Sequence, residues 1–346
     1  MKEAIGEYQK LGQDKLADLG LTNNLAFALF YGGDYAGACK SAQDLNPQPK
    51  ALLAACVAML QDSKAGLAEA ANAQKMKLSA AALLASTKPT AAKGLQILED
   101  ARKDAATDRE KTSIDLALVL GYDVQNNYEK LLAVSSLLLQ QVPESKIAFL
   151  ENTQSLTALG RYDEAMALAD QRLKLLDGDA DALRAKMAIA SARGDYAAAR
   201  GWAQKLVDQG KQDANLLNSI AWFSLFTGKV RQSDIAAAIK ATQMDRDDAA
   251  ILHTLACLYA ETGQTKDAHD LLLRGMDDLN LEQPDDDYWY AFGRIAEQYG
   301  ENQVAIDDYR KLEKPRHVLA LSTSGYLLAQ RRLKTLGADT TAVAGK

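Results

Sequence analysis

Side chains that commonly carry out catalysis are scarce in this sequence. Its 346 residues include three histidines, His253, His269 and His317, and none belongs to an H-E-x-x-H metal motif. The chain also lacks a C-x-x-C pair, a G-x-S-x-G nucleophile elbow and a glycine-rich phosphate loop. We therefore expect no enzymatic activity, no metal site and no cofactor, so the remaining chemistry is non-covalent binding.

Two pairs of residues have the spacing of a binding site on a helix. Asn218 and Trp222 are four residues apart, which places an amide that can pair with a peptide backbone beside a large apolar anchor. Tyr290 and Arg294 have the same spacing, and the guanidinium offers two parallel donors to a carboxylate. These pairs indicate recognition of a peptide or a partner protein.

Charge and cysteine content narrow the class of partner. The net charge is -6 and the isoelectric point is near 5.3, so we expect no nucleic-acid partner. Cys39, Cys56 and Cys257 lie in apolar helical stretches and are interpreted as buried small side chains. No apolar stretch reaches the roughly 18 residues of a membrane span, and the N-terminus lacks the features of a signal peptide. We expect a soluble protein, cytoplasmic by default and periplasmic or in the cell envelope if it is a fragment of an exported protein; its oligomeric state stays open.

Regularly spaced glycines indicate the elements that position these residues. Gly160, Gly194 and Gly228 are evenly spaced, and Gly263 continues the series with one extra residue. Each separates two apolar helical segments, and a fixed period with two helices is typical of a helical-repeat solenoid. Asn126 lies one such period before Gly160, and asparagine often replaces glycine in the left-handed conformation. The period therefore extends upstream.

The last repeat has a more specific pattern of large, small and turn residues. That pattern consists of Trp289, Phe292, Gly293, Gly300, Ala305, Tyr309 and Pro315. It resembles the tetratricopeptide repeat (TPR) family, and the preceding repeat resembles it too through Leu252, Leu255, Ala256, Tyr259, Gly263, Ala268 and Leu272. The resemblance implies an all-α fold, a right-handed superhelical solenoid of antiparallel helix pairs, with small residues where paired helices approach closely.

The pattern predicts a single solenoid domain over residues 1–336, with about eight to nine repeats. Its predicted parts are a half-repeat or N-terminal cap at 1–19, irregular repeats at 20–143, regular repeats at 144–315, a capping helix at 316–336 and a disordered tail at 337–346. Ser233-Asp234 stands where a second helix usually has a small residue, so we expect that helix to begin near Ile235.

The first helix is in the register of a second helix, because Ala4 lies one repeat period before Ala38. Either the chain was cut from a longer protein, which we favour, or this helix became a cap. Residues 21–27 and 289–296 also resemble C-terminal repeat regions of large exported bacterial proteins that carry a transglutaminase-like domain. That resemblance would account for a start in mid-repeat.

In the TPR family the first helix of each repeat faces the concave side, so the resemblance implies a peptide groove there. Its predicted lining residues are Asn23, Phe27, Tyr31, Arg184, Asn218, Trp222, Phe226, His253, Tyr290 and Arg294. The alternative is that Trp222 and Phe226 pack between adjacent repeats and that Arg294 pairs with Glu297.

Two functions remain open. A non-catalytic scaffold that binds a peptide or partner segment in the concave groove would leave Trp222 and Tyr290 accessible to solvent. A structural or docking arm of a larger, exported multidomain protein with a transglutaminase-like enzyme upstream would make its contacts through its ends and convex face. We favour the scaffold, and an enzymatic function of the chain itself is a distant third.

Overall fold

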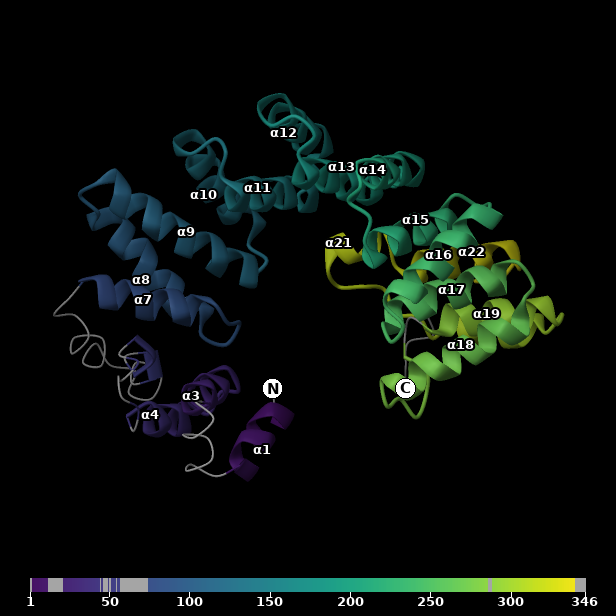
Figure 1. Cartoon of the computed structure of the whole chain (residues 1–346), viewed down its shortest axis with the longest axis horizontal. Helices are drawn as coiled ribbons and strands as arrows, with labels where there is room; N and C mark the ends of the chain where they lie inside the picture. Colours follow the sequence, from purple (N-terminus) through teal and green to yellow (C-terminus); the bar gives the residue numbers. More distant parts are fainter. Residues whose placement is uncertain are drawn as a thin grey trace. The chain divides into compact units, whose positions relative to one another are not determined.

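The computed structural model describes residues 2–11, 21–43, 45, 49, 51–53, 55–56, 74–285 and 288–339. Within these ranges the regular secondary structure is helical and contains no strand (Figure 1). The chain forms two compact units, Met1–Ser155 and Leu156–Lys346, which are described separately. The end of the predicted first helix, part of the irregular repeats and residues 340–346 lie outside the described residues.

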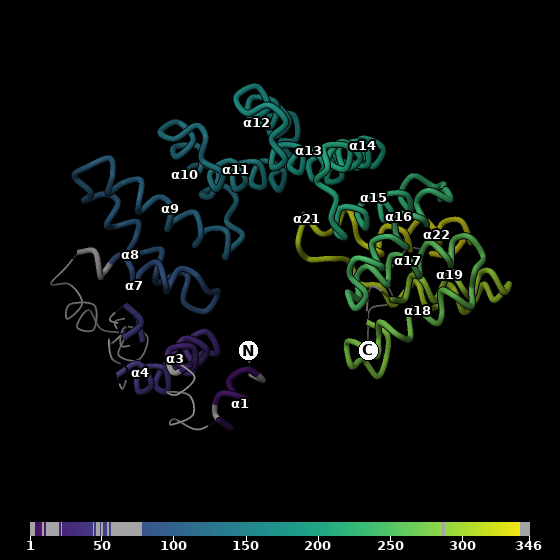
Figure 2. The backbone as a smooth tube through the Cα atoms, in the orientation of Figure 1, coloured from purple at the N-terminus to yellow at the C-terminus, as the bar shows by residue number. Residues whose placement is uncertain are grey.

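The described residues of the first unit are mainly helical. The helices are α1 (Lys2–Leu11), α3 (Thr22–Tyr31), α4 (Tyr35–Gln43), α7 (Gln74–Ala85), α8 (Ala91–Asp104), α9 (Asp108–Val124), α10 (Tyr128–Gln141) and α11 (Lys146–Ala158), which crosses the division between the units. Helices α3 and α4, α7 and α8, and α9 and α10 pack against each other as pairs. Consecutive helices of the unit turn back on one another in Figure 2.

The second unit contains the regular repeats. Its helices are α12 (Tyr162–Leu175), α13 (Ala180–Ala192), α14 (Tyr196–Asp208), α15 (Ala214–Phe226), α16 (Gln232–Met244), α17 (Ala249–Glu261), α18 (Thr265–Asp278), α19 (Tyr288–Gln298), α20 (Asn302–Tyr309), α21 (Val318–Leu321) and α22 (Gly325–Thr335). Each first helix packs on its own second helix, and α15, α17 and α19 also pack successively on one another. We call the surface of α15, α17 and α19 the first-helix face.

The turns between paired helices lie at the regularly spaced glycines, as the sequence predicted. Gly194 has a φ of 84°, which is costly for residues with a Cβ, and Asn126 takes the equivalent place with a φ of 54°. After Gly194, the Asp195 carboxylate accepts a hydrogen bond from the amide of Ala198 at 3.0 Å and caps α14. The same short sequence therefore ends one helix and starts the next.

Close packing within the last pair depends on Gly293. A Cβ added there would lie 2.5 Å from Cε1 of Tyr309, whose side chain is fully buried. We expect Gly293→Ala to lower the free energy of unfolding by about 2 kcal/mol, because a buried ring would have to move. Gly201 is the matched control, since it lies exposed within α14 with nothing within 4 Å of an added Cβ. Urea unfolding should show Gly201→Ala to be slightly stabilising, and equal destabilisation by both variants would contradict the packing argument.

The prediction that the helix after Gly228 begins near Ile235 is wrong, because α16 begins at Gln232. Asp234 is fully buried in its first turn. Its Oδ2 accepts a hydrogen bond from the amide of Arg231 at 2.8 Å, and its Oδ1 pairs with Arg200 of α14. A carboxylate can replace the usual small residue here because both of its oxygens have partners.

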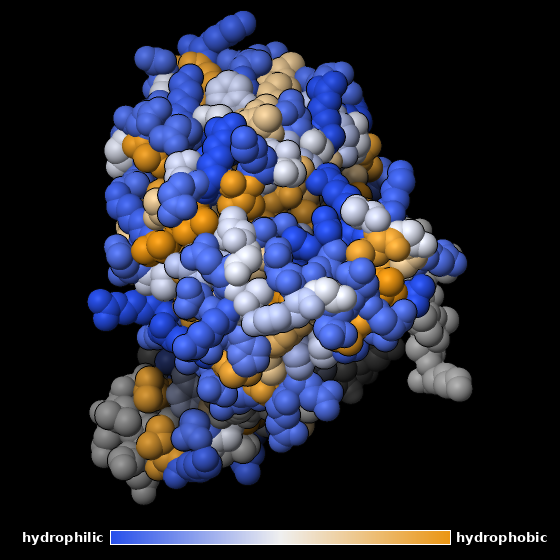
Figure 3. All heavy atoms as spheres, turned by 90° about the vertical axis from the view of Figure 1, so that its right-hand side faces the viewer, coloured by the Kyte–Doolittle hydropathy of each residue, from blue (hydrophilic) through white to orange (hydrophobic). Residues whose placement is uncertain are grey.

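The second unit also has an ordinary mixed surface on the side seen in Figure 3. Apolar groups are interspersed there with charged and polar residues. Exposed apolar side chains in this unit include Leu273 and Val304.

Candidate functional site

Residues 317–338 lie against the first-helix face of the second unit. The prediction of a single capping helix at 316–336 is wrong. The segment forms two helices, α21 and α22, separated by a turn at Ser322 and Thr323. We call residues 317–338 the C-terminal segment. Its contacts reach beyond the last repeat to α14 and α15.

Two side chains of the repeats donate hydrogen bonds to the backbone of this turn. The hydroxyl of Tyr196, at the start of α14, donates to the carbonyl of Ser322 at 2.5 Å. The indole Nε1 of Trp222 on α15 donates to the carbonyl of Thr323 at 2.9 Å. Because both acceptors are main-chain atoms, these two bonds do not depend on the sequence of the bound segment.

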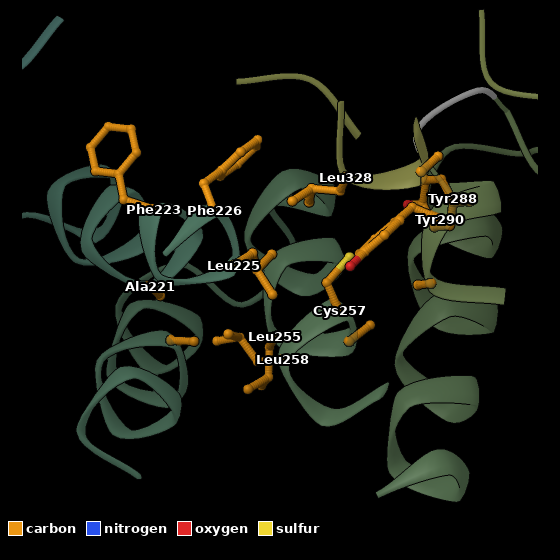
Figure 4. Packing of buried hydrophobic residues seen from close by; sticks show 14 of the residues in the cluster. Ala221, Phe223, Leu225, Phe226, Leu255, Cys257, Leu258, Tyr288, Tyr290 and Leu328 are labelled. Atoms are coloured by element: carbon orange, nitrogen blue, oxygen red, sulfur yellow. The ribbon is translucent and has the colours of Figure 1, made fainter. Parts of the chain in front are cut away.

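Helix α22 adds apolar contacts. Leu328, Ala329 and Leu333 are buried in the same hydrophobic cluster as Phe226 and Tyr290. In Figure 4, Leu328 lies between Phe226 on one side and Tyr290 on the other. Helix α22 therefore packs on both helices of the last pair, α19 and α20, and the same face also reaches Phe226 of α15.

Two arginines of α22 make the polar contacts. Arg331 donates from Nη1 to the carbonyl of Phe226 at 2.8 Å, and its guanidinium lies 5.8 Å from the Phe226 ring centroid. Arg332 binds both oxygens of Glu297, at 2.6 and 3.0 Å. Paired contacts of this kind fix the orientation of a guanidinium.

Glu297 is the centre of a buried polar network. It accepts hydrogen bonds from Arg332, from the hydroxyl of Tyr309 at 2.5 Å and from Arg294, which also donates from Nε to Glu261 at 2.8 Å. Burial raises the pKa of Glu297, but the hydrogen bonds from Arg332, Tyr309 and Arg294 outweigh it and leave the pKa below its ordinary value. The carboxylate is therefore ionised near neutral pH.

Four of the predicted groove residues are buried, namely Phe226, His253, Tyr290 and Arg294. The expectation that Tyr290 is accessible is wrong: it is 2% exposed and its hydroxyl donates to Glu261. Arg294 pairs with Glu297, as the alternative interpretation expected, and it also pairs with Glu261. These side chains support the face from beneath and do not meet solvent.

Three other predicted residues lie at the surface of the second unit. Trp222 is half-buried and its N–H is bonded to Thr323, so the expectation of an open indole is also wrong. Asn218 is half-buried, and its Oδ1 has no hydrogen-bond partner among the described residues. Arg184 pairs with Asp213 at 2.8 Å. The indole and the Asn218 amide are four residues apart on α15, as the sequence indicated.

The remaining three predicted residues form an open stripe on α3 in the first unit. Asn23 is exposed, Tyr31 is 40% exposed and half-buried Phe27 stacks on Tyr31 with ring centroids 6.3 Å apart. We call Asn23, Phe27 and Tyr31 the α3 stripe, and the equally spaced Asn218, Trp222 and Phe226 the α15 stripe. Each stripe ends two residues before a left-handed glycine, Gly33 or Gly228. The two stripes therefore occupy the same register of their repeats.

Sequence reasoning missed the partners of the C-terminal segment. The sequence assigned no role to Tyr196, and it placed Arg331 and Arg332 only within the predicted capping helix. The two carbonyl contacts join residues 126 and 101 positions apart. No spacing pattern within one repeat could have indicated them.

A half-buried acid with one buried oxygen occurs in the first unit at Glu151 of α11. Its Oε2 lacks a hydrogen-bond partner among the described residues, and burial together with the charge of Asp123 raises its pKa to about 7. The folded chain thus holds this proton up to a higher pH than the unfolded chain, so the free energy of unfolding falls as pH rises from about 4.5 to 7. We expect Glu151→Gln to stabilise the first unit by about 2 kcal/mol at pH 8 and hardly at all at pH 4.

Chemical unfolding at both pH values measures that difference. Glu129→Gln, at an exposed position of α10, is the matched control and should change little at either pH. A destabilising effect of Glu151→Gln at pH 8 would show that the ionised carboxylate has a favourable partner.

Helix pairs, evenly spaced left-handed turn residues and successively packed first helices define an all-α helical-repeat fold. No protein-family model matches the sequence, and the comparison with curated proteins gave no match. Among solved structures, the chain is similar to a tetratricopeptide repeat protein from Parabacteroides merdae ATCC 43184, with 14% identity, a TM-score of 0.47 and coverage of 82% of this chain and 97% of that one. It is also similar to the human IFIT1 dimer with m7Gppp-AAAA, with 14% identity, a TM-score of 0.47 and coverage of 92% and 80%.

Similarity at this level concerns helical architecture alone. Nothing in these comparisons supports the resemblance to repeat regions of exported transglutaminase-like proteins. None of the helices in the described ranges is both long and apolar enough to cross a membrane. The described residues likewise contain no group of three or more histidine, cysteine or acidic side chains placed to hold a metal ion.

Proposed function

We propose that this protein is a non-catalytic interaction scaffold that binds a peptide or partner segment on the first helices of its repeats. The observation that carries the proposal is the hydrogen bond from Trp222 to the carbonyl of Thr323. A first-helix aromatic residue here already holds the backbone of a peptide segment, which happens to belong to the same chain. The surface thus has the chemistry that peptide binding needs.

The α3 stripe is the open counterpart of that surface. Phe27 and Tyr31 offer a stacked aromatic pair at the surface, and exposed Asn23 can pair with a peptide backbone. Aromatic side chains dominate many protein interfaces because they bury much area with little loss of conformational entropy. In the second unit, Asn218, Trp222 and Arg184 are the candidates for direct contact, and Phe226, His253, Tyr290 and Arg294 hold the face in shape.

Selection of peptides from a display library on the immobilised full chain tests this function. We expect selected peptides to lose roughly tenfold or more in affinity on Phe27→Ala or Tyr31→Ala, as for aromatic residues at binding hot spots. Leu137→Ala is the matched control, because Leu137 is an exposed apolar residue of the second helix α10. Peptides that depend on Leu137 and not on the stripe would instead favour a docking arm that uses its convex face.

A further inference from the structure

We propose that the C-terminal segment is a removable ligand of the first-helix face, and that the partner which displaces it is a helix of another protein with leucine and arginine in the same arrangement. This inference rests on the proposed function, since it assigns the ligand class of the same kind of surface. The contacts of the segment, its connection and the open edge of its interface each support it.

The contacts of the segment are those of a bound peptide helix. Its turn is held by side chains that bond main-chain carbonyls, and α22 then presents Leu328, Arg331 and Arg332 on one side, three and four residues apart. Recognition of an amphipathic helix in a groove uses this spacing of anchors. A foreign helix with the same anchors would make the same contacts.

Charge at the site selects a basic helix. Arg332 lies against Glu297, whose side chain is 7% exposed, and Arg331 lies over the rings of Tyr196 and Phe226. An acidic residue in place of Arg332 would bring two carboxylates together in a poorly solvated position, which costs far more than it would at a surface. We therefore infer a partner helix that is apolar and basic, and we exclude an acidic one.

The connection allows the segment to leave without unfolding a repeat. The residues between α20 and α21 are not helical, and Glu313, Lys314 and Arg316 among them are exposed. The pairs α13 and α14, α15 and α16, α17 and α18, and α19 and α20 pack on each other without the segment, although α20 also contacts α22. Departure of α22 would uncover the first-helix face and leave those pairs in place.

A surface pocket of about 270 Å³ lies where α22 meets the repeats. Its lining includes Leu328, Arg331 and Thr335 from the segment and Lys229 and Tyr290 from the repeats. Lys229, Arg331 and Thr335 are exposed, so the edge of this contact is open to solvent.

Tethering sets the strength of the competition. A segment joined by a short connection has an effective concentration of about millimolar at its site. A free helix with the same contacts must compete with it, so its apparent affinity falls with the fraction of chains in which the face is open. Cutting the connection should remove this advantage while every contact stays intact.

The test uses a full chain with a site-specific protease sequence inserted after Arg316, and a fluorescent synthetic peptide of residues 317–338. We expect weak binding of the peptide to the uncut chain, and binding that is roughly tenfold or more tighter after cleavage and removal of the released segment by dilution. Trp222→Phe keeps an aromatic ring but lacks the N–H donor, and it should weaken peptide binding roughly fivefold, as loss of one hydrogen bond does. A control peptide with Arg332→Glu should not bind.

Several results would overturn the inference. One is a cut segment that stays bound and exchanges only when the second unit unfolds, as followed by circular dichroism; another is equal binding of the peptide to cut and uncut chains. Dimers formed by uncut chains that exchange their segments would show that the occupant is a second copy. The display selection tests binding at the α3 stripe, independently of the C-terminal segment. If the segment does not exchange but the selection yields peptides that depend on the α3 stripe, the proposed function still holds and only this inference fails.

Leu328→Asp provides a second route without proteolysis. A charge at this buried position should expel the tethered segment, and the wild-type peptide should then bind the variant and restore its thermal stability. A variant that gains neither binding nor stability from the peptide would contradict a separable ligand.

Discussion

Replacing Asp234 with alanine is expected to lower the free energy of unfolding of the second unit by about 3 kcal/mol. The substitution removes the partner of Arg200, whose side chain is 21% exposed, and leaves the amide of Arg231 at the start of α16 without its acceptor. Breaking a buried ion pair from one side is costly because the remaining charge stays poorly solvated. Loss of the helix cap adds to that cost.

Chemical unfolding of three variants separates the two contributions. Asp234→Asn keeps an oxygen that can accept from the Arg231 amide but has no charge, so it should cost less than Asp234→Ala. Ser233→Ala is the control, because Ser233 is the exposed neighbour of Asp234 on α16. If both Asp234 variants unfolded at the wild-type midpoint, the ion pair would make no net contribution to the free energy of unfolding.

The helix pairs were predictable because their determinants are local. Gly194 with φ of 84°, and the Asp195 carboxylate that caps α14, act within a few residues of one another. A turn that recurs at a fixed interval is thus visible in sequence before any packing is known. Gly293 was interpretable for a similar reason, since its neighbour Tyr309 belongs to the same repeat.

Asp234 was misread because its function depends on a side chain from the preceding repeat. The repeat pattern calls for a small residue at this place, and Arg200 lies 34 residues earlier. The repeat pattern describes the usual packing of a small residue at this place. It does not anticipate an ion pair between two repeats that takes the place of that packing. The start of α16 was therefore predicted too late.

The candidate site was predicted less well than the fold, and the C-terminal segment is the reason. Trp222 was assigned to an open surface, but its indole N–H donates to the carbonyl of Thr323, 101 positions away. Tyr290 was assigned to the same surface, but it is buried and its hydroxyl donates to Glu261 of the preceding repeat. Periodicity carries no information on contacts of that range, so it identified the face and missed what lies on it.

Glu297→Gln is expected to destabilise the second unit by about 4 kcal/mol near neutral pH. Arg294, which is 8% exposed, would keep only Glu261 as a charged partner, and Arg332 of α22 would lose its partner on α19. Removal of one member of a buried ionic network typically costs roughly 3–5 kcal/mol, because the remaining charge stays poorly solvated. Glu313→Gln, at an exposed position after α20, is the matched control and should have little effect.

The pH dependence of this effect follows from the pKa of Glu297, which lies below its ordinary value in the folded chain. For an acid with a lowered pKa, the added stability is complete above the pKa of the unfolded chain, about 4.3, and is lost as pH falls through the folded value. The difference in unfolding free energy between wild type and Glu297→Gln should therefore be constant near neutral pH and shrink below about pH 4.3. A difference that persisted unchanged at pH 3 would contradict an ionised Glu297.

The same variant connects the stability of the network with the removable segment. Glu297 joins α19 to α22 through Arg332 and holds Arg294 within the face itself. Glu297→Gln should therefore speed release of the cut segment and also weaken the repeats, whereas Arg332→Gln should speed release and leave the Arg294 pairs with Glu297 and Glu261 intact. Comparing peptide exchange with unfolding in these two variants decides whether α22 is held as a ligand or as part of the core. If Arg332→Gln releases the segment faster and leaves the unfolding free energy of the repeats unchanged, α22 is a ligand. If Arg332→Gln lowers that free energy as much as Glu297→Gln does, α22 is a structural helix.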